Sequence, residues 1–418
     1  MEYYQGRIWV QVGARQYSGG DIIYGPSGTP AGNANSILRW VENTYLAGGG
    51  VFSVPSSGGS IRGLSYTANM DTATGQANLI IGTRDAVYAL DVPVSRTDWI
   101  AAGGVGADLP VQKVIQNRYG PVSDRSMVRS NSDLFYQAYD GVRSLQIALR
   151  YFNQHGQTPI SHNENRVLQF NNRAFLSFAS GIEFDNRLLQ TVLPFQTSVG
   201  VAHQGIMPLD FDLLTTLQEK LPPAWEGMHE GLDFMQLLQA ESGGLQRAFT
   251  VVHSQSTGRI QIWEMTNYSK TDHGDVRIKW YAEFPAYTWD SLFTMKKEDS
   301  AELWIDKLSG TVDFTLWYRP DSDPCWQLWH KWRICSARNT CEDVENPVCY
   351  PLQEYCQGYR ATMVMPKPPV ACSNQVRRPS NFGLQFQAKL EVKGFCRVRG
   401  FLIHALPVET SPYEGIIC

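Results

Sequence analysis

Histidine side chains can serve as general bases or metal ligands, and this chain has eight of them. They are His155, His162, His203, His229, His253, His273, His330 and His404. No two of them have the spacing at which a single helix or strand presents a pair of ligands to a metal ion. His155 and His162 flank a short loop, where we expect hydrogen-bonding roles. The histidines therefore predict no metal site.

Two pairs of carboxylates have a spacing that allows chemistry. Asp210 and Asp212 form one pair, and Glu183 and Asp185 form the other. Residues two apart on a strand point to the same side, so such a pair could hold a cation or hydrolyse a glycosidic bond. Carboxylates in a solvated turn produce the same pattern, and this is the interpretation that we favour.

The sequence carries no motif for nucleotide binding or nucleophilic catalysis. It has no Gly-x-Gly-x-x-Gly after a strand, no phosphate-binding loop that ends in Lys-Ser or Lys-Thr, and no Gly-x-Ser-x-Gly. We therefore predict that the chain is not an enzyme, and we assign no catalytic, cofactor-binding or metal-binding residues and no cofactor.

All the cysteines lie after Pro324. They are Cys325, Cys335, Cys341, Cys349, Cys356, Cys372, Cys396 and Cys418. This clustering favours a locally stapled segment, and the absence of Cys-x-x-Cys gives little support to a zinc site. Reduced thiols and disulfides that form after release from a cell both remain open, as does the pairing of any of them.

The charge pattern argues against tight binding of nucleic acid. The chain has 36 Lys and Arg and 40 Asp and Glu, for a formal net charge of −4. Its densest cationic stretch, residues 330–333, is short, whereas phosphate recognition normally needs a basic stripe. A weakly acidic surface would still allow passive contact with sliding DNA.

The sequence also predicts neither a membrane anchor nor a secretion signal. No apolar run approaches the ~18 residues that span a bilayer. The first ten residues lack a basic segment followed by an apolar one. Asn267-Tyr268-Ser269 fits a glycosylation acceptor, which carries little meaning without a signal peptide.

Pairs of apolar runs separated by turn residues recur along the whole chain and predict β-hairpins. After a first strand at 7–12, the pairs are 77–82 with 86–90, 133–139 with 142–145, 173–178 with 187–192, 249–253 with 259–263, 302–305 with 311–317, and 384–392 with 396–403. Asp140-Gly141 lies between two apolar runs and is among the stronger short hairpin signals. Only three short helices are expected, at 35–42, 210–220 and 231–240.

Hairpins that recur every 40 to 60 residues, by analogy with propeller blades, predict an all-β β-propeller of about five to seven blades. We expect blades with inserted loops and a few short helices over residues 1–320, a Cys-, Pro- and Trp-rich loop insertion over 321–380, and a hairpin over 381–418 that closes or extends the propeller. Two β-sandwiches or a β-solenoid are the rival architectures. Trp326, Trp329 and Trp332 recur every third residue and predict packing against a sheet, with a binding patch as the alternative.

Several stretches resemble large virion proteins of tailed bacteriophages. They are residues 181–189, 159–168, 41–46 and 318–321, with Pro324-Cys325-Trp326 after the last. The group that they are most similar to is the tail nozzle, or tail-stabilisation, proteins of short-tailed phages (podoviruses), which are head–tail connector proteins. The resemblance covers most of the chain diffusely and carries over no site residues.

The resemblance implies a structural virion protein. Such proteins form a homo-oligomeric ring, usually sixfold, that continues the DNA channel used in ejection and docks portal, adaptor and fibre proteins. The chain would then be assembled in the bacterial cytoplasm and reside in the virion tail. The Gly-rich segments 17–33 and 54–59 and the Cys-rich region would be the places for subunit contacts. A receptor- or carbohydrate-binding module on the virion and a glycan-degrading propeller enzyme are the alternatives; blade number, ring stoichiometry, host and loop partners stay open.

Overall fold

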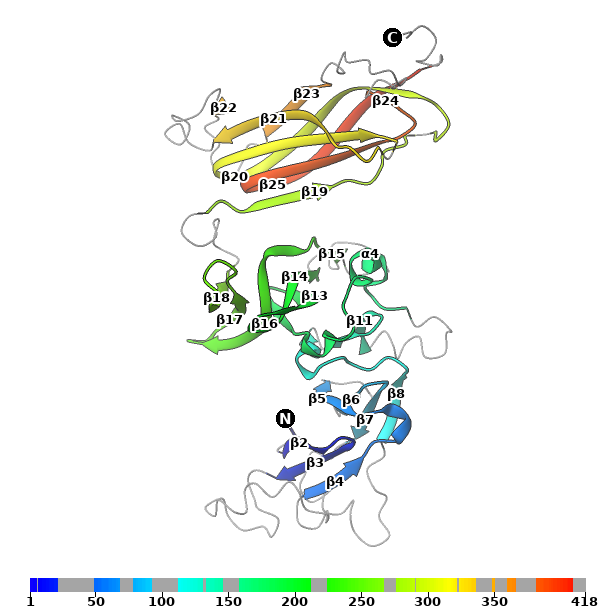
Figure 1. Ribbon diagram of the computed structural model, residues 1–418, viewed down its shortest axis with the longest axis vertical. Coiled ribbons are helices and arrows are strands. Elements are labelled where there is room, and N and C mark those ends of the chain that lie inside the picture. Colours follow the sequence, from blue (N-terminus) through cyan, green and yellow to red (C-terminus); the bar gives the residue numbers. More distant parts are fainter. Residues whose placement is uncertain are drawn as a thin grey trace. The chain divides into compact units, whose positions relative to one another are not determined.

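The chain divides into two compact units, Met1–Asn267 and Tyr268–Cys418. The computed structural model describes residues 1–5, 7–21, 49–67, 78–91, 112–130, 133–145, 158–211, 224–266, 276–289, 291–321, 323–335, 348–349, 359–365 and 381–408. Antiparallel strands dominate both units, and each unit is described by itself below (Figure 1).

The first unit begins with three small antiparallel sheets in which each strand pairs with the next one along the chain. The strands of the first sheet are β1 (Glu2–Tyr4), β2 (Arg7–Gly13), β3 (Gln16–Asp21) and β4 (Gly49–Ser53). Those of the second are β5 (Ile61–Thr67), β6 (Asn78–Thr83), β7 (Ala86–Asp91) and β8 (Gln112–Asn117), and those of the third are β9 (Val128–Ser130), β10 (Asp133–Ala138) and β11 (Gly141–Ser144).

A larger sheet completes the first unit. Its strands are β12 (Gly181–Phe184), β13 (Arg187–Thr197), β14 (Gly200–Asp210), β15 (Ala224–Trp225), β16 (His229–Ser242), β17 (Leu245–His253) and β18 (Ile260–Met265). The described helices are all short: η2 (Ser56–Gly58), η3 (Asp124–Ser126), η4 (His162–Glu164), α4 (Asn165–Leu168) and η5 (Leu176–Phe178).

The four sheets of the first unit pack face to face in chain order. Trp9 of the first sheet shares a core with Leu79 of the second. The next residue of β6, Ile80, lies on the opposite face of that sheet and shares a second core with Leu134 of the third. Phe135, on the other face of the third sheet, packs with residues of the fourth. Both faces of the middle sheets are thus buried, which explains their continuous apolar runs.

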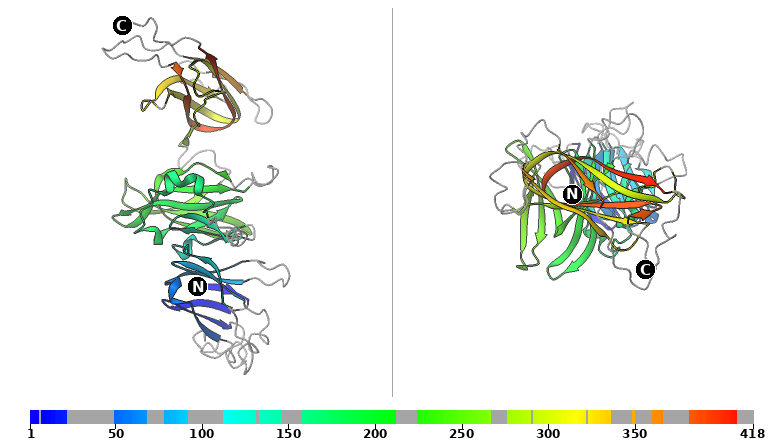
Figure 2. Two further views of the ribbon diagram at one scale, coloured as in Figure 1. Left: turned by 90° about the vertical axis from the view of Figure 1, so that its right-hand side faces the viewer. Right: turned by 90° about the horizontal axis from the view of Figure 1, so that it is seen from above.

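The second unit is one sheet built on two long strands, β20 (Lys296–Pro320) and β25 (Phe386–Pro407), which run antiparallel side by side for most of their length (Figures 1 and 2). The other strands are β19 (Lys279–Glu283), β21 (Gln327–Cys335), β22 (Val348–Cys349), β23 (Tyr359–Val364) and β24 (Phe382–Gly383). β19 and β21 flank one half of the long pair, and β23 flanks the other half.

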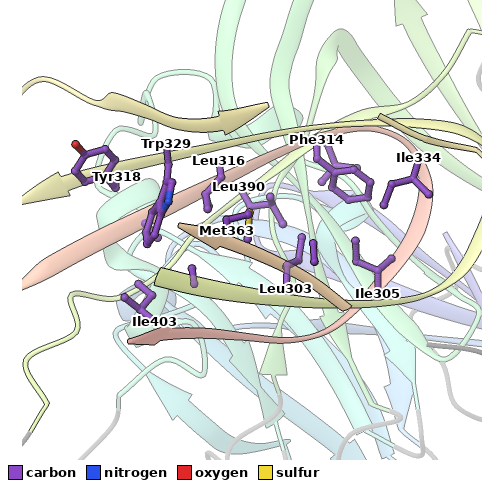
Figure 3. Packing of buried hydrophobic residues seen from close by; sticks show 14 of the residues in the cluster. Leu303, Ile305, Phe314, Leu316, Tyr318, Trp329, Ile334, Met363, Leu390 and Ile403 are labelled. Atoms are coloured by element: carbon purple, nitrogen blue, oxygen red, sulfur yellow. The ribbon is translucent and has the colours of Figure 1, made fainter. Parts of the chain in front are cut away.

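The halves of the long strands enclose a common core (Figure 3). Leu303 and Ile305 come from the first half of β20, and Phe314 and Leu316 come from the second half. Trp329 of β21 is also in this cluster. Because both halves supply core residues, the sheet folds over onto itself like part of a barrel.

The prediction of an all-β protein is confirmed, whereas the blade number and the closure of a ring stay predictions. The division into units differs from the expected one at 320 and 380, because the boundary lies near residue 267. Strand β20 ends at Pro320 and pairs with β25, which begins at Phe386. The borders expected at 320 and 380 would therefore divide a single sheet.

Three of the predicted hairpins are confirmed. β6 pairs with β7 across the turn at Arg84 and Asp85, and β10 pairs with β11 across Asp140. β17 pairs with β18 across residues 254–259, as predicted for the segments 249–253 and 259–263. In all three cases the signal was local, because a turn joined two runs that are neighbours in the chain.

The predicted strand at 173–178 is wrong. Its end forms the short helix η5, and Phe178 is exposed. The partner of β13 is instead β12, which follows that segment. The turn between them is Asp185-Asn186, where both residues have positive φ, at 53° and 55°. That conformation belongs to a tight hairpin turn, for which Asp and Asn are favoured residues.

The last two predicted hairpins, 302–305 with 311–317 and 384–392 with 396–403, are also wrong. Each is one continuous strand, and the two strands pair with each other. The expected turn at Ser309-Gly310 lies opposite the other expected turn, at Lys393-Gly394, because Ser309 pairs with Phe395. The register shifts between Ser309 and Asp313, so the glycines mark a bulged bend rather than chain reversals.

The helix expected at 231–240 is a strand, β16. Phe234 and Leu237 are both buried in one core, and their spacing of three resembles that of a helix. The cause is a register shift against β17 between Phe234 and Gln236, which turns side chains three apart to the same face. The helix expected at 35–42 lies outside the described residues, and so does most of the one expected at 210–220. Of the latter, Asp210 is the last residue of β14, and Phe211 follows it.

The region expected as an irregular insertion at 321–380 contains β21, β22 and β23, and the rest of it lies largely outside the described residues.

Ser18-Gly19-Gly20 was expected in a loop and forms part of β3. A side chain at Gly19 would meet the Trp9 ring at 2.7 Å, so glycine allows that ring to lie across the sheet. In the segment 54–59, Val54 and Gly58 are buried inside the first unit.

Candidate functional site

Two of the four carboxylates that form pairs in the sequence, Asp185 and Asp210, are bound by one arginine. Arg187 on β13 lies with Nη2 3.4 Å from Asp210 Oδ2, Nη1 3.3 Å from Asp185 Oδ2, and Nε 3.0 Å from Glu226 Oε1. The guanidinium occupies the position that a bound cation would need. Glu183 lies on β12, and Asp212 is outside the described residues. The structure therefore brings Asp185 and Asp210 together as an ion-pair network.

The histidines are dispersed over different environments. His203 is fully buried, with Nδ1 3.1 Å from the Phe234 carbonyl oxygen, and burial lowers its pKa to about 4. His253 Nδ1 lies 3.3 Å from Asp233 Oδ2, and Gln255 donates to the other oxygen of that carboxylate. His330 packs beside Trp332, His162 is exposed on η4, and His229 begins β16. His155 and His273 lie outside the described residues.

Among the residues that the structure describes, no three His, Cys, Asp or Glu side chains form a group that could hold a metal ion. None of the described helices has the length and hydrophobicity of a membrane span. Of the cysteines, Cys325 is exposed, and Cys335 and Cys349 are direct backbone neighbours across β21 and β22. Cys341, Cys356, Cys372 and Cys418, and the possible acceptor at 267–269, lie outside the described residues.

The spaced tryptophans are mostly core residues. Trp329 is buried against Tyr318, and Trp332 stacks on Phe314 with ring centroids 5.0 Å apart. The guanidinium carbon of Arg319 lies over the Trp326 ring, 4.3 Å from its centroid. Because β21 has a register shift at Trp329, two tryptophans three apart both reach the core. Packing against the sheet, the favoured prediction, is therefore what the structure has.

A different tryptophan provides the best candidate site. Trp304 lies on the outer face of β20 and is 47% exposed, while its neighbours Leu303 and Ile305 point into the core. In the sheet register, Trp304 lies opposite Arg360 of β23 on one side and Gly400 of β25 on the other. We call the outer surface of these three strands the Trp304 face.

A polar network lies beside the ring. Glu302, two residues before Trp304, accepts hydrogen bonds from Arg360 Nη2 and from Trp304 Nε1, the latter at 3.4 Å. His404 Nε2 of β25 is 3.6 Å from the same carboxylate. The guanidinium carbon of Arg360 lies 5.3 Å from the centroid of the Trp304 ring. Three strands thus fix one carboxylate and one aromatic ring next to each other.

The electrostatics keep this carboxylate ionised. The hydrogen bond from Arg360 is the main cause that lowers the pKa of Glu302, and the charges of Arg360 and His404 act in the same direction. The same bond raises the pKa of Arg360. Across the pH range of most experiments the two groups form a neutral, charge-assisted pair with fixed geometry.

The space next to Trp304 is open. A Cβ atom built on Gly400 would meet no atom of the described residues within 4 Å. Leu402, two residues farther along β25, is 51% exposed, and Val364 of β23 is 74% exposed on the same face. The Trp304 face therefore combines an accessible aromatic ring, exposed aliphatic groups and an ordered set of hydrogen-bonding groups. Such a combination can bind a ligand with one flat apolar side and a polar edge.

The sequence contained only part of this signal. Because side chains alternate along a strand, the strand predicted at 302–305 puts Trp304 on the face opposite Leu303 and Ile305. The neighbours of Trp304 across the sheet, Arg360 and Gly400, are 56 and 96 residues away from it in the sequence. The predicted hairpins paired the wrong strands and therefore did not place these residues beside Trp304.

A comparison with known protein families finds no match to this chain. A comparison with curated proteins finds no significant match.

Proposed function

We propose that the chain is a non-catalytic structural protein of the virion of a tailed bacteriophage. In this proposal it forms a ring in the tail nozzle or neck, continues the DNA channel, and docks neighbouring tail proteins or fibres. The proposal starts from the resemblance of its sequence segments to tail nozzle proteins. Its fold and its ionisable groups support that role.

The observation that carries the proposal is the serial packing of the first unit. Its four sheets share cores in chain order, with the middle sheets buried on both faces. Adjacent blades of a β-propeller pack in the same way. Such a body resists deformation because its interior is close-packed, and a ring that carries the force of DNA ejection needs rigid subunits.

The state of the ionisable groups supports a non-catalytic role. A glycosidase needs two carboxylates that flank its substrate, one of them free to donate a proton. Asp185 and Asp210 are instead both bound to Arg187, and Asp313 is bound to Arg277 and Arg333. Fixed ion pairs of this kind suit a structural protein, and they do not favour the enzyme alternative.

A glycan-binding role on the virion is the second candidate, and one observation favours it specifically. The Trp304 face has an exposed aromatic ring beside a fixed carboxylate and guanidinium. Aromatic rings stack on the apolar faces of sugars, and paired polar groups bind sugar hydroxyls. A tail component could carry both roles.

Imaging tests the structural role. Tails isolated from phage particles that encode this chain should contain it in several copies, and class averages should show a cyclic ring. The proposal would be contradicted if mass spectrometry failed to detect the chain in purified particles, or if it were present at one copy per particle.

A further inference from the structure

We propose that the Trp304 face binds one uncharged pyranose unit of a glycan, seated above Gly400 and against the Trp304 ring. This inference rests on the second candidate function and names its ligand class and binding position. It is independent of the ring proposal, because a ring subunit need not bind sugar.

The first argument is the shape of the row Arg360, Trp304 and Gly400. These residues are neighbours across three strands, with the tryptophan in the middle. The guanidinium of Arg360 lies over the ring from one side. On the opposite side, Gly400 leaves open space where other residues would project a side chain. The Trp304 ring therefore borders this gap, and the backbone at Gly400 lies beneath it. The flat C–H side of a pyranose could pack against the ring there.

The second argument is the supply of hydrogen bonds. Glu302 is only 8% exposed and receives bonds from Arg360 and Trp304, so its orientation is fixed before a ligand arrives. Arg360 lies across the Trp304 ring from the seat above Gly400, so its role is to hold the carboxylate in place. A sugar hydroxyl that reaches past the edge of the ring could donate to the carboxylate, and little ordering entropy would be lost.

The charge of the site determines the class of sugar. Glu302 and Arg360 neutralise each other, so this pair offers no net positive charge to an acidic sugar. A uronate or sialate carboxylate next to Glu302 would meet a like charge in a partly desolvated position. An uncharged hexose or N-acetylhexosamine avoids this repulsion. Binding should accordingly change little with ionic strength.

The test uses the full chain on a glycan array that carries uncharged oligosaccharides of glucose, galactose, mannose and N-acetylglucosamine, together with uronate- and sialate-containing ones. We expect binding to a subset of the uncharged glycans. The dissociation constant of the best one is then measured by calorimetry. Binding to none of the uncharged glycans, or to acidic ones only, would overturn the proposal.

Two variants locate the site, and a third serves as the control. Trp304→Ala removes the stacking surface, and Gly400→Leu puts a side chain into the gap at a position where a Cβ atom meets no described atom within 4 Å. We expect each to weaken binding at least tenfold, while Trp304→Tyr retains part of it. Gly227→Leu makes the same chemical change at another glycine with open space around it, and it should leave binding unchanged.

The thermal unfolding midpoint separates loss of binding from loss of fold. Gly400→Leu should leave the midpoint unchanged, because Gly400 has no unusual φ and no close neighbour. Unaltered glycan binding by Gly400→Leu would overturn the proposed seat. The glycan would also be the wrong occupant if that variant changed the oligomeric state, because the face would then be a protein contact. The search for a ring in isolated tails tests the structural role separately.

Discussion

At the residue scale, each unit buries an ionisable side chain whose charged form the surroundings do not stabilise. In the first unit, His203 has no exposed surface, and no described residue bonds to its Nε2. In the second, both carboxyl oxygens of Glu298 are buried without a hydrogen-bond partner among the described residues. Burial disfavours charge on both groups, but it lowers the pKa of a histidine and raises that of a carboxyl. The two units should therefore respond to pH in opposite directions.

His203 should make the first unit less stable in acid. Burial lowers its pKa to about 4 from a reference near 6.5. As the pH falls from about 6.5 to 4, the unfolded chain takes up a proton that the folded one does not, so the free energy of unfolding should fall by about 3 kcal/mol. His203→Asn should remove this contribution, because its amide can still bond to Phe234 but does not titrate. Urea unfolding between pH 7.5 and 4 measures the effect.

The control for this experiment is His162→Asn, which changes an exposed histidine. It should preserve the pH dependence of the parent chain. If His203→Asn kept the same pH dependence as well, the buried imidazole would not be its source.

Glu298 should make the second unit less stable in base. Burial raises its pKa to about 9 from 4.5, so the folded chain holds a proton at neutral pH that the unfolded chain has lost. Stability is then lost progressively as the pH rises above 4.5, by about 3 kcal/mol at pH 7, and the loss levels off near pH 9. Glu298→Gln should unfold at a higher temperature than the parent at pH 8, and at nearly the same temperature at pH 4.5.

The neighbouring Asp299 is exposed and supplies the matched control, Asp299→Asn. This variant should follow the parent at both pH values. An equal gain in Asp299→Asn, or no gain in Glu298→Gln at pH 8, would contradict the role given to the buried carboxyl.

At the scale of elements, β-bulges and glycine bends account for most of the differences between the predicted and the observed strands. The hairpins β6–β7, β10–β11 and β17–β18 could be predicted because their turns are local. The helix predicted at 231–240 and the spacing of Trp329 and Trp332 follow instead from register shifts. A bulge changes which residues share a face, and nothing in the apolar pattern distinguishes its spacing of three from that of a helix.

The bend of β20 and β25 gives the clearest case. Gly310 and Gly394 sit where turns were expected, and both have positive φ, at 66° and 129°. A turn glycine and a bend glycine have the same local sequence signature. Only the pairing of Ser309 with Phe395 shows that the strands continue past the bend. The Trp304 face could not be predicted for the same reason, because it needs the correct partner strands.

The two glycines of this bend should differ in their tolerance of a side chain. At Gly394, a Cβ atom would lie 2.7 Å from the Thr311 carbonyl oxygen, whereas at Gly310 it would meet no described atom within 4 Å. Gly310→Ala should cost about 1 kcal/mol for the left-handed backbone alone. Gly394→Ala should cost about 3 kcal/mol or more, because strain and the clash add. Chemical denaturation of the second unit measures both, and equal costs would contradict the bend geometry.

At the scale of the whole molecule, the chain combines two all-β units of different construction. The first stacks small meanders in chain order, and the second folds one sheet of long strands over its core. The sequence predicted the strand content but placed the main division at 320 rather than near 267. Composition changes near 320, whereas a unit boundary depends on which strands pair, and here those are distant in sequence.

The measurement that tests the central claim most directly is a cryo-electron microscopy reconstruction of the tail of particles that encode this chain. The two units should be fitted as separate bodies. We predict that both fit a density repeated around the tail axis and that the repeats surround the channel through which DNA passes. Density for the chain only at the tips of fibres, or in a single copy away from the axis, would contradict a structural ring and would favour a receptor-binding module.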